Sequence, residues 1–166
     1  MTLGLTWGVR PAERTVPLSC DALRPLPGVQ ADRAIGIAAP PPIVFSWLCQ
    51  LRAAPYSYDL LDNLGRRSPR ARNPELARLE AGRRFMTIFA LQSFVDGEQI
   101  TLRSRGVAVT YAVWPEGAGS RLHVRVWFGG PRLLARVLAL GDLMMMRKQL
   151  LTLKALAERD AAAAID

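Results

Sequence analysis

The sequence has few of the residues that build metal centres and disulfide frameworks. Its 166 residues include two cysteines, Cys20 and Cys49, and a single histidine, His123. The cysteines form no CxxC pair and no cluster with histidine, so we expect free thiols and no metal site. A lone histidine makes neither a typical multi-histidine metal site nor, without a partner nucleophile, a catalytic triad. We therefore expect neither a metal ion nor a nucleotide cofactor.

No apolar run is long enough to cross a membrane. The densest run, from Leu133 to Met146, is interrupted by Arg136 and Asp142 and falls short of the roughly 20 residues that a bilayer requires. Residues 1–16 show no basic leader before a long apolar segment, which a secretion signal would have. We expect a protein that stays in the cytoplasm.

Lysine is scarce too, with Lys148 and Lys154 against twenty arginines, and the formal net charge is +8. Seven arginines fall between Arg66 and Arg84, and such a basic stretch attracts phosphate or an anionic membrane surface. It contains no aromatic residue before Phe85 that would stack on a base. A solvated loop is therefore favoured over nucleic-acid binding, while contact with an anionic membrane stays open.

What the sequence does contain fits one globular domain. Half of the residues are hydrophobic and 22% are charged, and the length allows one substantial core rather than two. Residues 1–30 are rich in proline and glycine and are expected to form an extended arm packed on the domain. The domain itself is expected to cover residues 31–160, followed by a frayed tail at 161–166.

A strand and two short helices are expected after the arm. Residues 32–37 alternate as a strand. Pro40 to Pro42 suit the first turn of a helix, and apolar residues in 43–51 recur at helical spacing. Ser57 is an N-cap candidate for a second helix over residues 58–64.

Four strands with short connections are expected next, at 85–93, 98–104, 107–114 and 121–128. Glycine-containing turns separate them, which implies an antiparallel meander. In the last strand, alternate side chains are expected to face the core and water in turn. The water-facing set is Arg121, His123, Arg125 and Trp127.

Residues 133–159 are expected to form one helix, roughly 40 Å long at 1.5 Å per residue, which is enough to cross the whole sheet. Its charged residues cluster on one side, as Arg132, Arg136, Arg147, Lys154 and Glu158. The opposite side is expected to face inward and contains Leu134, Leu138, Gly141, Met145, Gln149, Thr152 and Leu156.

Several short strings accompany this order of elements: Thr6-Trp7-Gly8, Pro25-Leu26-Pro27-Gly28, Ala39-Pro40-Pro41, Tyr56-Ser57-Tyr58-Asp59 with Asp62-Asn63, and Met145-Met146-Arg147-Lys148-Gln149-Leu150. With them, nearly the whole chain resembles the helix-grip fold of the SRPBCC superfamily, which includes START-like lipid-transfer domains and polyketide cyclase/dehydratase-like proteins. The resemblance implies an α+β fold in which a curved antiparallel sheet wraps around a long C-terminal helix. It also implies an apolar cavity between the sheet and this helix. It implies no fixed catalytic residues, so the fold alone does not choose a reaction.

The leading hypothesis is a binding module for a hydrophobic or aromatic small molecule, lipid-like or polyketide-like. Gly141 favours either a ligand or close packing of helix on sheet, because glycine inside a helix costs about 1 kcal/mol relative to alanine. Gln149 brings a polar group inward and needs a partner there. The candidate ligand contacts are Trp47, Tyr56, Tyr58, Phe85, Tyr111, Leu138, Gly141, Met145 and Gln149.

Two alternatives remain open. In the first, the protein is a cyclase/dehydratase-type enzyme in which Tyr58 and Asp59 donate and accept protons. Asp59 has a structural explanation as well, because a carboxylate is favourable at the positive end of a helix. Lys148 is a separate candidate for chemistry, but its side chain can extend to solvent. In the second, the protein collects a lipid from an anionic membrane on which the stretch from Arg66 to Arg84 docks.

Overall fold

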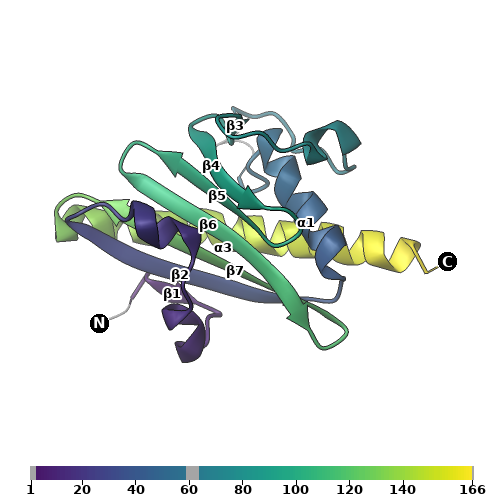
Figure 1. The fold of residues 1–166 in the computed structure, drawn as a ribbon, viewed down its shortest axis with the longest axis horizontal. Coiled ribbons are helices and arrows are strands. Elements are labelled where there is room, and N and C mark those ends of the chain that lie inside the picture. Colours follow the sequence, from purple (N-terminus) through teal and green to yellow (C-terminus); the bar gives the residue numbers. More distant parts are fainter. Residues whose placement is uncertain (1–2, 59–63, 166) are drawn as a thin grey trace.

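Alternating side chains and glycine turns give the chain a seven-stranded sheet, along which one long helix runs (Figure 1). The computed structural model describes residues 3–58 and 64–165. The strands are β1 (Thr6–Trp7), β2 (Gly28–Ile37), β3 (Arg84–Phe85), β4 (Phe89–Val95), β5 (Gln99–Ser104), β6 (Val107–Glu116) and β7 (Gly119–Gly129).

The strands lie in the order β1-β2-β7-β6-β5-β4-β3, so the sheet is open at both edges. Strands β3 to β7 form the expected antiparallel meander. Strand β2 then pairs antiparallel with β7 over its whole length, from Gly28 opposite Gly129 to Ile37 opposite Ser120. Only the short β1 pairs in parallel with its neighbour among the strands that the structure describes.

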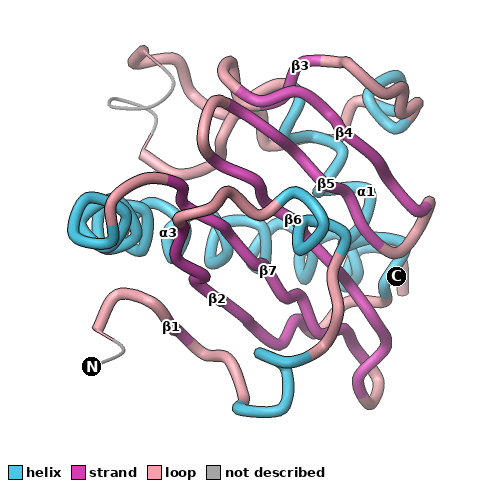
Figure 2. Tube along the Cα trace, turned by 60° about the vertical axis from the view of Figure 1, so that its left-hand side comes forward, coloured by secondary structure: helices cyan, strands magenta, loops and turns pink. Residues whose placement is uncertain are grey.

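Helices α1 and α3 cover one face of this sheet (Figures 1 and 2). Helix α1 (Pro41–Cys49) begins directly after Pro40, as the proline run predicts. Helix α3 (Arg132–Ala163) is 32 residues long and follows the turn at Gly129–Gly130. The short 3₁₀ helices are η1 (Pro11–Thr15), η2 (Ser19–Leu23), η3 (Gln50–Arg52) and η4 (Pro74–Ala77). Most of the helix predicted at 58–64 falls on 59–63, outside the described residues.

The main core lies between the sheet and helices α1 and α3. Alternate residues of β7 enter it, including Leu122 and Val124, and Trp47 of α1 is fully buried there. Cys20 and Cys49 are free and buried, and burial raises the pKa of each thiol to about 11. Neither thiol is therefore a ready nucleophile at neutral pH.

The expected orientation of α3 requires a correction. Leu134, placed inward by the helical pattern, is 53% exposed, while the neighbouring Ala135 is fully buried. Ala139 is buried in the same way. The small side chains turn toward the sheet because they allow the helix backbone to approach β2 closely, where the Ala139 carbonyl accepts a hydrogen bond from Arg33 Nη2 at 3.1 Å. Of the inward set, Gln149 and Leu156 are buried as expected, whereas Leu138 (45%), Met145 (40%) and Gly141 are exposed.

The prediction that one face of β7 meets water is wrong. Arg121 is 6% exposed, His123 is 0% exposed and Arg125 is 2% exposed. Residues before β2 cover this face: Arg121 Nε donates to Glu13 Oε1 at 2.7 Å, and Trp127 Nε1 donates to Asp21 Oδ1 at 2.9 Å. Apolar contacts complete the cover, because Leu18 and Cys20 form a second, smaller core with Ala108 and Ala112 of β6.

Asp32 lies at the centre of this covered face. Its Oδ1 atom is 3.0 Å from His123 Nε2 and accepts from Arg125 Nε at 2.9 Å, while its Oδ2 atom accepts from Gln30 Nε2 at 2.8 Å. Burial alone would raise the pKa of Asp32, but the hydrogen bonds from His123, Arg125 and Gln30 outweigh it and lower the pKa. The carboxylate therefore stays ionised and holds the N-terminal residues on the sheet through Arg125, whose Nη1 also donates to the Val16 carbonyl at 2.7 Å.

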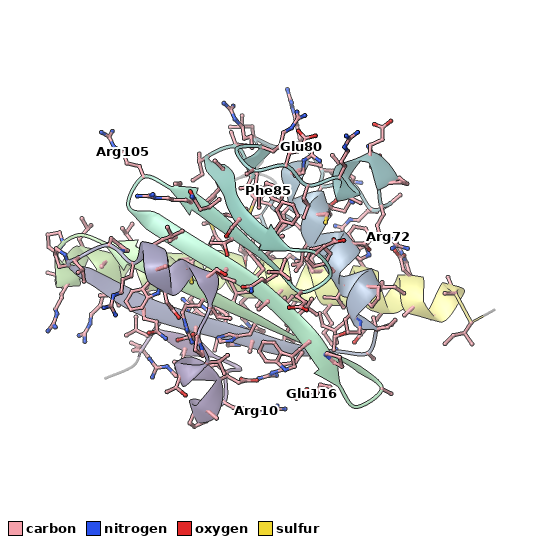
Figure 3. All side chains as sticks on the ribbon, in the orientation of Figure 1. Arg10, Arg72, Glu80, Phe85, Arg105 and Glu116 are labelled. Atoms are coloured by element: carbon pink, nitrogen blue, oxygen red, sulfur yellow. The ribbon has the colours of Figure 1, made fainter. Side chains whose placement is uncertain are left out.

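The residues that cover this face of the sheet include Arg10, which reaches the end of β6 at Glu116. Figure 3 shows Arg10 and Glu116 together beside the tip of β6, where Arg10 Nη1 donates to Glu116 Oε1. Arg10 is mostly exposed, so this pair contributes little to stability compared with the buried pairs around Asp32.

Candidate functional site

A pocket of about 920 Å³ opens between α3 and the core face of the sheet. This volume lies in the upper part of the range for small-molecule sites, roughly 300–1,000 Å³. The sheet supplies Ser104, Val107, Val109, Tyr111, Val126 and Phe128, and α3 supplies Val137, Leu138, Gly141, Asp142, Met145, Met146 and Gln149. Phe89 of β4 also contributes, and the other described lining residues are Ala53, Pro55, Ser57, Leu64, Arg66, Met86, Thr87 and Ile88. Most of the walls are apolar, which suits a molecule with a large apolar surface.

Gly141 opens the pocket from the helix side. A Cβ atom added at Gly141 would meet no heavy atom within 4 Å. Of the two explanations left by the sequence, close packing of helix on sheet is therefore excluded at this position. Gly141 is exposed, and its missing side chain leaves open space at the accessible part of the pocket wall.

Several residues with unfavourable, positive φ angles lie at or next to the edge of the same pocket. The described non-glycine residues with positive φ are Tyr56 (56°), Leu64 (52°), Met86 (45°) and Thr87 (71°). Three of them line the pocket and Tyr56 lies between two lining residues. Positive φ is unusual for such side chains, above all for a β-branched one like Thr87. The turn at Met86 and Thr87 also divides the strand predicted at 85–93 into β3 and β4.

The buried end of the pocket contains a closed pair of polar side chains. The Tyr111 hydroxyl donates to Gln149 Oε1 at 2.7 Å, and Gln149 Nε2 donates to the Pro55 carbonyl at 2.6 Å. Tyr111 is 1% exposed and Gln149 is 4% exposed. Burial raises the pKa of Tyr111, and the negative charge of Asp142 raises it further, so the phenol stays protonated.

Asp142 is the acidic residue among the lining residues that the structure describes. Its side chain is 20% exposed, and its Oδ2 atom lies 3.4 Å from Nη2 of the fully buried Arg33. Burial raises the pKa of Asp142 to about 6, although the charge of Arg33 lowers it in part. Arg33 is held from behind by backbone carbonyls, including that of Gly4, which accepts from Nη2 at 2.9 Å.

Five of the sequence-predicted contacts line the pocket, and four of the candidates lie elsewhere. Trp47 and Phe85 are 0% exposed within the packed core, and Trp47 Nε1 donates to Asp160 Oδ2 at 3.1 Å. Tyr56 is 1% exposed and packs edge-on against the Trp47 ring. Tyr58 is 40% exposed and does not line the pocket. The five in the lining are Tyr111, Leu138, Gly141, Met145 and Gln149.

The other candidate groups are placed as follows. Asp59 lies outside the described residues. Lys148 is exposed on α3, and it does not line the pocket. Among the residues described, no group of three or more His, Cys, Asp and Glu side chains could hold a metal ion. Within the same residues, no helix combines the length and the apolar character that crossing a membrane requires.

The basic stretch from Arg66 to Arg84 is exposed at all seven arginines. Several of them are neutralised by acids of this chain: Arg72 Nε is 2.9 Å from Asp160 Oδ2, and Arg83 Nη2 is 2.8 Å from Glu80 Oε2. Figure 3 shows the labelled Arg72 and Glu80 side chains at the periphery of the molecule. Arg66 also lines the pocket, which the sequence did not indicate.

The sequence did not indicate the role of Asp142 either. The signal for it is a single acid inside the apolar run from Leu133 to Met146, next to a glycine predicted to face inward. A charged residue in such a position is either on the solvent side of the helix or in a polar part of a cavity. The partner that distinguishes the two is Arg33, which is 109 positions away in the sequence.

Comparison with solved structures identifies the architecture. The chain is similar to protein MLL2253 from Mesorhizobium loti, with 15% identity over 79% of this chain and 98% of that chain and a TM-score of 0.53. The KanY protein shares 15% identity over 78% of this chain and 97% of that one, with a TM-score of 0.51. The di-domain ARO/CYC StfQ from the steffimycin biosynthetic pathway shares 14% over 81% of this chain and 52% of that one, with a TM-score of 0.52.

No protein-family model and no curated protein matches the sequence. At these identities the likeness shows the fold alone. The chain has the helix-grip fold, as the resemblance seen in the sequence implied.

Proposed function

We propose that the protein binds a hydrophobic or aromatic small molecule, lipid-like or polyketide-like, in the pocket between α3 and the sheet. The observation that carries this proposal is a pocket of about 920 Å³ with mostly apolar walls, to which Gly141 adds open space. A well-formed apolar pocket with a few polar groups is the usual form of a small-molecule site. The helix-grip fold adds support, because cavities at this place hold apolar compounds in the superfamily that the sequence resembles.

The first test is binding of N-phenyl-1-naphthylamine, a neutral probe whose fluorescence rises in apolar surroundings. We expect a saturable increase, because the pocket offers a limited apolar volume to a probe of this kind. Extraction of the purified protein with organic solvent, followed by mass spectrometry, is expected to release an apolar compound that copurifies. A linear, unsaturated fluorescence response, together with repeated absence of any extracted compound, would reject binding in the pocket.

A cyclase/dehydratase-type enzyme remains the alternative, and the fold likeness to StfQ supports it. Tyr58 and Asp59 are its candidate acid and base. The exposed position of Tyr58, outside the pocket lining, makes binding the better-supported function. Docking on an anionic membrane is the weaker alternative: the lining residues Leu64 and Ile88 are 87% and 71% exposed near the basic stretch that ends at Arg84.

A further inference from the structure

One end of the pocket is polar, and its hydrogen-bond donors are engaged within the protein while some of its acceptors are not. The Tyr111 hydroxyl hydrogen is used by Gln149 Oε1. The Gln149 amide donates to the Pro55 carbonyl at 2.6 Å and also points toward Met86 Sδ at 3.3 Å. The donors of these two buried side chains are therefore engaged within the protein, while the second lone pair of the Tyr111 oxygen remains available as an acceptor.

Asp142 adds further acceptors beside this pair. Among the described residues, its one hydrogen bond is the 3.4 Å contact between its Oδ2 atom and Arg33 Nη2, which is long for a charge-assisted bond. The Arg33 guanidinium directs most of its hydrogen bonds to backbone carbonyls, among them those of Gly4 at 2.9 Å and Leu5 at 3.0 Å. Arg33 thus compensates Asp142 only in part, and the carboxylate retains unused acceptor capacity at the pocket wall.

Groups that donate hydrogen bonds lie on the more accessible parts of the lining. Arg66 and Thr87 are exposed, and Ser104 and Ser57 are half-buried. Water therefore competes for Arg66 and Thr87, whereas Asp142 is half-buried, with its side chain 20% exposed, so that a missing hydrogen bond costs more there than at those exposed groups. Among the described residues, the end of the pocket formed by Tyr111, Gln149 and Asp142 is therefore rich in acceptors and poor in free donors.

We propose that the pocket selects neutral, mostly apolar molecules that carry a hydroxyl group, and that Asp142 accepts the hydrogen bond from that hydroxyl. This inference rests on the proposed function, since it specifies which apolar molecules the same pocket prefers. A ligand with an ionised carboxylate would bring a second negative charge to Asp142. An ammonium group would pair with Asp142 but would lose more hydration on entering the apolar walls than a hydroxyl does.

Three ligands with one bicyclic skeleton test this preference: 2-naphthol, 2-methylnaphthalene and 2-naphthoate. Each displaces bound N-phenyl-1-naphthylamine from the wild-type protein at about pH 7.5, where 2-naphthol is neutral and 2-naphthoate is ionised. We expect 2-naphthol to bind at least about tenfold more tightly than 2-methylnaphthalene, because a hydrogen bond to a charged acceptor in a partly dry site contributes that much. We expect 2-naphthoate to bind more weakly than 2-naphthol.

The Asp142→Asn variant tests whether Asp142 causes the preference for 2-naphthol. The amide keeps the size of the side chain and an acceptor for Arg33 but removes the charge, so the preference for 2-naphthol should fall to within about threefold. Glu98→Gln is the matched control: it makes the same acid-to-amide change at an exposed turn outside the pocket and should leave the preference unchanged. If Asp142→Asn does not fold, the ligand series on the wild-type protein still tests the inference.

Equal affinities for 2-naphthol and 2-methylnaphthalene, or tightest binding of 2-naphthoate, would overturn the inference while leaving pocket binding intact. An undiminished preference in Asp142→Asn would overturn the assignment to Asp142. Failure of N-phenyl-1-naphthylamine itself to bind would instead overturn the proposed function, and the inference with it.

Discussion

Gly141→Leu is expected to lower the affinity for N-phenyl-1-naphthylamine by at least about tenfold. Gly141 is an exposed residue of the pocket lining, and a Cβ atom at this position meets no heavy atom within 4 Å, so we expect the new side chain to fill space at the pocket wall. It would therefore occupy ligand space rather than displace protein atoms. A tenfold loss corresponds to about 1.4 kcal/mol of binding free energy, less than the transfer free energy of one buried leucine side chain, roughly 1.5–3 kcal/mol.

The same substitution should not destabilise the fold. Replacing a glycine inside a helix removes an unfavourable propensity of about 1 kcal/mol, so the free energy of unfolding of Gly141→Ala and Gly141→Leu should equal or exceed that of the wild type. Ala155→Leu is the matched control, because Ala155 is an exposed residue of α3 outside the pocket. Unchanged probe affinity in Gly141→Leu, with the protein folded, would show that the probe binds elsewhere.

Asp32→Ala is expected to lower the free energy of unfolding by about 3–5 kcal/mol, the usual cost of removing one partner from a buried ion pair. The substitution would leave Arg125 Nε and His123 Nε2 without the carboxylate that each contacts, at 2.9 Å and 3.0 Å. Urea unfolding followed by circular dichroism measures the loss. Asp96→Asn, at an exposed turn, should change the unfolding free energy by less than about 0.5 kcal/mol.

This stabilisation should depend on pH in a defined direction. Hydrogen bonds hold the pKa of Asp32 in the folded protein below its usual value of 3.8. The contribution of Asp32 is therefore fully present above that value and is lost as the pH falls through the lower pKa of the folded state. The difference in stability between wild type and Asp32→Ala should shrink in that acidic range. A difference that stays constant down to the acid unfolding of the wild type would contradict an ionised Asp32.

The order of elements could be predicted because strong local signals define it. Residues 133–159 lie inside the observed α3, and the turns around Gly97, Gly106 and Gly117 mark the ends of the meander strands. These features depend on the spacing of apolar residues and on a few backbone conformations. Both are determined by residues that are close together in the sequence.

The parts that could not be predicted depend on contacts between distant segments. His123 and Arg125 alternate as a solvent face would, and only the cover by residues such as Val16 and Asp21 buries them. The rotation of α3 escaped prediction for a related reason. A hydrophobicity pattern favours Leu134 over Ala135 as the inward residue, whereas close packing on the sheet favours the smaller side chain.

The candidate site shows the same division. Tyr111 and Gln149 follow from alternation along β6 and from the inward side of α3, and the structure brings them together at 2.7 Å. Trp47 and Phe85, two of the predicted ligand contacts, are instead packed in the core. Asp142 acquires its role through Arg33, a partner that no local pattern reveals.

Methionine methyl groups offer the most direct test of the claim that the pocket between α3 and the sheet is the binding site. Met86, Met145 and Met146 line the pocket, whereas Met144 is 65% exposed and does not. In protein labelled with ¹³C at the methionine methyls, titration with N-phenyl-1-naphthylamine should shift the signals of the three lining residues along one saturation curve and leave Met144 nearly unchanged. Single methionine-to-leucine variants assign the signals. Saturable probe binding with unmoved lining methyls, or with Met144 shifting most, would contradict the account.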